Sequence, residues 1–218
     1  MSENFEHKGA REFADEVTDD DIERWAKRIV AEGGERISMN DFYDIYDKQK
    51  LNDDRRDLTD IKEKFARDDK PLNAKEMAKE ERRKRVSEAV EVTLAYCGET
   101  QDWFGENAYL IRTSEYDDVI NGVDLVVEFD LGSEDDEPRR VALTVDVTTA
   151  VEKSVLEKKI KRNAEKTFTR KGDKKAQIKY FKSEANDYKG PLENIVPIVI
   201  GLEWQNAVKL LELQSQLF

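Results

Sequence analysis

Two stretches in the middle of the chain alternate between apolar and polar residues, and together they predict a β-hairpin. The first stretch is VDLVVEFD (123–130) and the second is RRVALTVDVTTA (139–150). Successive side chains of a strand point to opposite faces, so this period of two gathers the apolar residues on one face of a sheet. The other face then carries Asp124 on the first strand and Asp146 on the second.

The register of this hairpin decides whether the two acids meet. A symmetric hairpin that pairs Asp130 with Arg140 places Asp124 opposite Asp146. Facing residues of an antiparallel pair have Cβ atoms about 4.5–5.5 Å apart, so two carboxylates would repel each other there. A divalent cation is the simplest way to offset that repulsion. A slip of one residue would separate the acids.

The rest of the chain divides into helical and strand patterns. A joint at 68–73 (DDKPLN) separates an acidic helical unit (1–70) from a larger domain (71–218). We therefore expect an α/β protein with a small helical N-terminal unit. Helices are predicted at about 20–32, 39–51, 54–67, 74–97, 152–168, 174–187 and 203–217, and strands at 108–113, 123–130, 139–150 and 194–202. Pro197 in the last strand indicates either an edge position or a bulge.

The predicted helix at 74–97 carries two candidate site residues. Asn73 can cap its start and Gly98 is expected to end it. Its first half is mostly charged and its second half mostly apolar, so it should begin in solvent and end buried. Glu88 and Glu91 lie in the second half. Because a buried glutamate without a partner is costly, each should either reach the rim or serve a site.

Composition excludes several classes of chemistry. Charged residues make up 39% of the chain and apolar residues 38%, and no apolar stretch approaches the about 20 residues that span a bilayer, so no membrane partner is expected. Cys97 is the only cysteine, which precludes an internal disulfide and favours a cytoplasmic location. His7 is the only histidine, which argues against histidine catalysis and against zinc sites built from Cys and His.

Charge is unevenly distributed along the acidic chain, whose net charge is −12. Residues 1–70 contain 21 acids and 14 bases, whereas residues 153–182 contain 12 bases and 3 acids. An acidic protein with one strongly basic sector can still bind phosphates there. The alternative interpretation of the basic run is a solvated helix face.

From residue 74 to 202 the expected order is helix, three strands, helix, strand. With its acids placed as above, this order resembles the αβββαβ core of the PD-(D/E)XK nuclease superfamily, the restriction-endonuclease-like fold with a mixed central sheet flanked by helices. Val123-Asp124 stands at the family's Pro-Asp, and Asp146-Val147-Thr148 at its (D/E)-X-K. Asp118 lies close enough in sequence to Asp124 to assist, although turn chemistry also explains it.

Thr148 departs from the motif, which has lysine at that position. In some members the following helix supplies the lysine, and Lys159 is then the first choice, with Lys153 and Lys158 as alternatives. Glu88 best matches the glutamate that the family has on its first helix, with Glu91 second.

The resemblance implies a nuclease that depends on Mg²⁺ or Mn²⁺ and cleaves phosphodiester bonds, with DNA favoured over RNA. Asp124 and Asp146 would hold the metal, and Glu88 and Lys159 would complete the catalytic set. The phosphate backbone would be held by Lys158, Lys161, Arg162, Lys166, Arg170 and Lys171.

Two alternatives belong to other functional classes. The domain could have lost catalysis, as Thr148 suggests, and bind nucleic acid without cutting it. It could also be a protein-interaction module whose acidic N-terminal helices dock a basic partner or a second copy of the chain.

Overall fold

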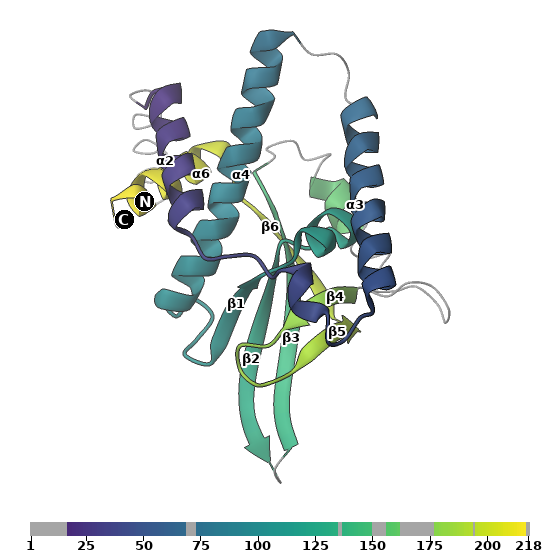
Figure 1. Cartoon of the computed structure of the whole chain (residues 1–218). Coiled ribbons are helices and arrows are strands. Elements are labelled where there is room, and N and C mark those ends of the chain that lie inside the picture. The colour runs from purple at the N-terminus through teal and green to yellow at the C-terminus, as the bar shows by residue number, and fades with distance from the viewer. Residues whose placement is uncertain are drawn as a thin grey trace.

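The computed structural model describes residues 17–68, 73–134, 137–149, 156–161, 177–193 and 195–216. Its centre is a four-stranded mixed sheet with the order β1-β2-β3-β6 (Figure 1). The first three strands are antiparallel neighbours, and β6 runs parallel to β3 at the edge, one of the two arrangements that Pro197 indicated. The strands are β1 (Ala108–Arg112), β2 (Leu125–Glu134), β3 (Glu137–Thr148) and β6 (Val196–Gly201).

The predicted hairpin register is confirmed. Leu125 pairs with Val145 and Asp130 with Arg140, so the sequence positions of paired residues keep one constant sum over this part of the ladder. Asp124 directly precedes β2, and its backbone N–H donates to the carbonyl of Val145 at 2.9 Å. The ladder therefore ends with Asp124 on one strand and Asp146 on the next.

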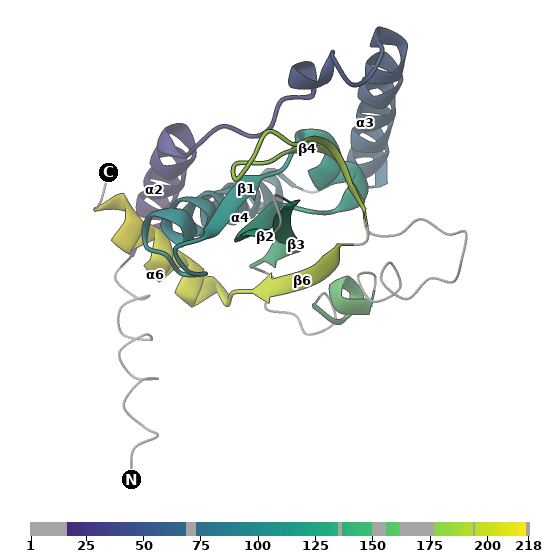
Figure 2. The ribbon, with the colours of Figure 1, turned by 90° about the horizontal axis from the view of Figure 1, so that it is seen from below.

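Three helices cover one face of the sheet (Figure 2). They are α2 (Asp19–Glu32), α4 (Ala74–Thr100) and α6 (Trp204–Ser215), which also contact one another. The alternation in the hairpin builds their common core, because the apolar residues at every second position face these helices. This core includes Ile22, Ala26, Ile29, Val86, Val90, Leu125, Val127, Val145, Val147 and Leu211.

The opposite face of the sheet is covered by a second, two-stranded sheet of β4 (Gln177–Lys182) and β5 (Lys189–Glu193). The helix predicted at 174–187 is therefore wrong. A register shift in β4 between Ile178 and Phe181 brings both side chains into one cluster with Val126. Apolar residues three positions apart imitate a helical period, so the sequence pattern was misleading here.

The N-terminal segment continues with a 3₁₀ turn, η1 (Met39–Phe42), and a long helix, α3 (Lys48–Asp68). The helix predicted at 39–51 is wrong, because Ser38 caps only the single turn of η1. The Asp47 carboxylate accepts the Lys50 N–H at 2.7 Å and starts a new helix, which runs through the break expected near residue 52.

The start of α4 was predicted correctly, with Asn73 as its N-cap, but its end was not. Gly98 lies inside the helix, which continues to Thr100. A Cβ atom at position 98 would stand 2.4 Å from Cδ2 of Leu110, so this glycine allows β1 to approach α4 closely. None of the helices in the described ranges is long and apolar enough to cross a membrane.

Part of the predicted helix at 152–168 is described, as a short helix at 156–161 beside β6 (Figure 2). Leu156 packs toward Gly201, where an added Cβ would meet its Cδ1 atom at 3.6 Å. The contact fixes this helix against the end of the sheet at which the two aspartates lie.

Candidate functional site

The two aspartates of the hairpin are buried at one end of the sheet. Asp124 is 8% exposed and Asp146 is 4% exposed. One carboxylate oxygen of Asp124 accepts the backbone N–H of Val147 at 2.6 Å, which ties the side chain to the neighbouring strand. The sequence prediction that these two acids come together is consistent with this arrangement.

Lys159 reaches the same place from the 156–161 helix. Its Nζ donates to Oδ1 of Asp146 at 2.6 Å and to the carbonyl oxygen of Val147 at 2.9 Å. An ammonium group therefore lies beside the second acid even though Thr148 occupies the position two residues after it. Lys158, the adjacent alternative, is exposed, and Lys153 lies outside the described residues.

The two glutamates of α4 differ in their surroundings. The Glu91 side chain is 12% exposed, and burial together with nearby Asp118 raises its pKa to about 7. Glu88 is 42% exposed and lies 3.6 Å from the Arg112 guanidinium. Glu91, which ranked second to Glu88 in the sequence analysis, is thus the more enclosed of the two glutamates.

The surroundings of Asp124 disfavour its charged form. Burial raises its pKa most, followed by the negative charges of Glu91 and Asp118 and, more weakly, Asp146; together they raise it to about 8 against the hydrogen bond from Val147. Burial is thus the main reason that the charged form of Asp124 is disfavoured, and the neighbouring acids add to it.

Sequence reasoning missed Arg36, which approaches the acids from the segment after α2. Its Nη1 lies 2.6 Å from the Asp118 carboxylate and its Nη2 lies 3.2 Å from that of Glu91. These partners are 82 and 55 residues away in the chain, so no local pattern indicated the contact.

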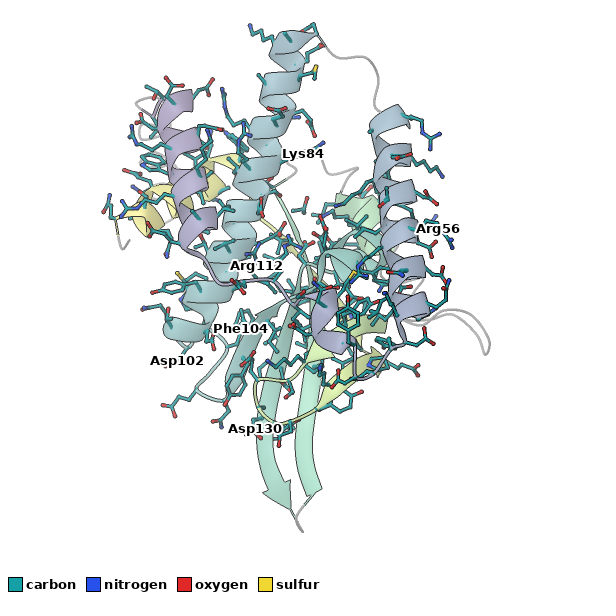
Figure 3. The ribbon with its side chains drawn as sticks, in the orientation of Figure 1. Arg56, Lys84, Asp102, Phe104, Arg112 and Asp130 are labelled. Carbon is teal, nitrogen blue, oxygen red and sulfur yellow. The ribbon has the colours of Figure 1, made fainter. Side chains whose placement is uncertain are left out.

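A second arginine, Arg112, ends strand β1 and lies beside helix α4 (Figure 3). Besides approaching Glu88, its guanidinium donates to the carbonyl oxygen of Gly34 at 2.8 Å. It thereby links β1 to the segment that carries Arg36.

The predicted phosphate-binding residues are only partly described. Lys158 and Lys161 lie exposed on the 156–161 helix, close in sequence to Lys159. Arg162, Lys166, Arg170 and Lys171 lie outside the described residues.

In the described ranges, no three His, Cys, Asp or Glu side chains converge closely enough to hold a metal ion by themselves. A metal ion at this site would therefore depend on one or two carboxylates together with water or substrate oxygens, which is how proteins usually bind Mg²⁺.

Comparisons of the chain with protein-family models, curated proteins and solved structures give no match. The acids and cations that the fold brings together are therefore the features that indicate a function.

Proposed function

We propose that this protein is a divalent-metal-dependent nuclease that hydrolyses phosphodiester bonds, with DNA as the favoured substrate. The observation that carries the proposal is the contact of Lys159 with buried Asp146, the hairpin neighbour of buried Asp124. An ammonium group among acids that share one end of a hairpin is a combination suited to phosphoryl chemistry.

The residues fit a hard divalent cation. Asp124 and Asp146 offer oxygen atoms, the ligands that Mg²⁺ and Mn²⁺ prefer. The pKa of Asp124 is raised first by burial and then by the charges of Glu91 and Asp118, and a bound cation would offset those charges. When bound, such a cation would polarise the phosphate and lower the pKa of a bound water.

Lysine side chains of the protein would supply the other functions of the site. Lys159, held by Asp146 and the Val147 carbonyl, would orient the attacking water and stabilise the charge that develops on the phosphate. The exposed Lys158 and Lys161 would hold the nucleic-acid backbone without reading its sequence.

The order of elements supports the proposal by analogy. Helix α4, strands β1, β2 and β3, the 156–161 helix and strand β6 come in the order of the αβββαβ core of the PD-(D/E)XK nucleases, with β4 and β5 of the second sheet inserted before β6. A fold by itself does not establish an activity, so the lysine position has more weight. Lys159 supplies the charge that Thr148 lacks and favours an active enzyme over an inactive nucleic-acid-binding module.

Cleavage of linear and circular DNA, and of RNA, in Mg²⁺ and in Mn²⁺ tests the proposal. We expect wild-type protein to cut DNA and Asp146→Asn protein to bind it without cutting. Lys27→Met, which alters an exposed pair with Glu23 on α2, is the matched control and should cut normally. Binding without cleavage by the wild type in every metal would support the inactive module instead.

A further inference from the structure

Helix α3 has an apolar stripe that is buried at one end and exposed at the other. Leu58, Ile61 and Phe65 are three and four residues apart, so they share one face of the helix. Leu58 is buried and Ile61 is half-buried, but Phe65 is 57% exposed. The face that packs against the protein near the middle of α3 therefore presents an uncovered aromatic ring near its end.

Printed contacts connect this part of α3 to the two aspartates of the hairpin. The Thr113 hydroxyl donates to the backbone carbonyl of Asp124 at 3.1 Å, and two residues later Glu115 pairs with Lys62 of α3. Phe65 lies three residues beyond Lys62, which is about 4.5 Å along the helix axis. The ring thus belongs to the end of the sheet at which Asp124 lies.

Helix α4 presents a lysine above the same end of the sheet. Lys84 precedes Glu91 by seven residues, or two turns, so both lie on one face of α4. Glu91 is joined through Arg36 to Asp118, whereas Lys84 is exposed about 10 Å further along the helix. Helix α3 and the first half of α4 both extend beyond the end of the sheet at which β2 begins, and Lys84 lies on this extension (Figures 1 and 3).

An exposed ring and exposed ammonium groups are the surface that single-stranded nucleic acid binds, because its bases stack on aromatic side chains while cations follow its backbone. We propose that Phe65 stacks on a base of single-stranded DNA and that Lys84 contacts a phosphate, so that the site takes single strands in preference to duplex. The inference rests on the proposed function, which places the scissile bond at Asp124 and Asp146.

Base stacking explains the preference for single strands. In a duplex each base is already stacked on its neighbours, and freeing one costs a few kcal/mol. A single strand offers its base faces to Phe65 at a lower cost. Lys84 of α4, together with exposed Lys158 and Lys161 of the 156–161 helix, supplies positive charge from two different elements for the backbone of the same strand.

Equilibrium binding of fluorescent oligonucleotides to full-length protein, with a chelator present to prevent cleavage, tests the role of Phe65. We expect a single strand to bind more tightly than the duplex of the same sequence. Phe65→Leu keeps an apolar side chain but removes the ring, so it should weaken single-strand binding by about 5-fold or more, the contribution of one stacked base. Phe65→Tyr should bind like the wild type. Trp103→Ala, which removes a 49% exposed ring just after the other end of α4, is the matched control and should leave the affinity unchanged.

The salt dependence of the same binding tests Lys84. One phosphate contact fewer should reduce the slope of log affinity against log salt concentration by about 0.7 in Lys84→Gln. Phe65→Leu should keep the wild-type slope, because the ring carries no charge. Lys27→Gln, which removes an exposed lysine of α2, is the matched control and should also keep it. An unchanged slope in Lys84→Gln would contradict the phosphate contact.

Failure of this inference and failure of the proposed function give different results. A duplex bound as tightly as the single strand, or an unchanged affinity in Phe65→Leu, would overturn the role of Phe65; cleavage of DNA in Mg²⁺ by the same protein would leave the nuclease proposal standing. A wild-type protein that neither binds nor cuts nucleic acid would overturn both.

Discussion

Lys159 donates a 2.6 Å hydrogen bond to Asp146 from a helix that lies 13 residues further along the chain. The contact places a lysine beside the second acid of the hairpin, where the short motif in the sequence has Thr148. The proposed cleavage activity therefore depends on this one side-chain contact.

Lys159→Met should slow cleavage by about 10²-fold or more, the usual contribution of a positioned catalytic group. DNA affinity should change little, because Lys158 and Lys161 remain. Single-turnover rates and equilibrium binding separate the two effects. Thr148→Lys in the Lys159→Met background should recover part of the rate, since it returns a lysine to the motif position. Equal rates in Lys159→Met and wild-type protein would contradict this role.

Metal affinity should rise with pH. Burial and neighbouring acids raise the pKa of Asp124 to about 8 and that of Glu91 to about 7 in the metal-free protein. Asp124 must lose its proton to bind a cation, so binding should release protons and should be weaker at pH 6.5 than at pH 8.5. Calorimetry in two buffers of different ionisation enthalpy measures the release. Binding heats that are the same in both buffers would contradict the prediction.

The metal-free protein should lose stability as pH rises between about 4 and 8. Asp124 has an unfolded-state pKa of about 3.9 and a higher folded-state pKa, so the folded state binds more protons across this window. The free energy of unfolding then falls with pH. Urea unfolding with a chelator present should show a shallower fall in Asp124→Asn than in the wild type. The same slope in both proteins would exclude Asp124 as the cause.

Asp54 should anchor α3 to the second sheet. It is 2% exposed and contacts both the Lys179 ammonium and the Tyr180 hydroxyl of β4. Asp54→Ala leaves the largely enclosed Lys179 without its carboxylate partner, which should lower the free energy of unfolding by about 3 kcal/mol.

The matched control for this prediction is Asp44→Ala. Asp44 pairs with Lys189 of β5 at 2.7 Å but is 66% exposed, so its loss should change the free energy of unfolding by less than about 1 kcal/mol. Urea unfolding of both variants makes the comparison. Similar losses in the two would show that burial does not distinguish these ion pairs.

Patterns local in the sequence predicted much of the fold. The hairpin register followed from a symmetric closure that pairs Asp130 with Arg140, and the structure has that pairing. A slip of one residue would have moved every side chain to the other face. The start of α4 followed from Asn73, whose side chain caps the helix. Local patterns failed in β4, where a register shift placed Ile178 and Phe181 on one side at a spacing that imitates a helix.

The amino-acid sequence by itself determined that Asp124 and Asp146 end the same hairpin, because one residue pair of an antiparallel ladder sets the register of all the others. It left Lys159 among three candidate lysines and Glu91 behind Glu88, and it gave no sign of Arg36. The tertiary structure decided the positions of Lys159, Glu91 and Arg36, because each position depends on which side chain from another element reaches the acids. Arg36 meets Glu91 and Asp118 across 55 and 82 residues, and contacts over such separations arise only when helix α4, strand β1 and the segment after α2 pack together.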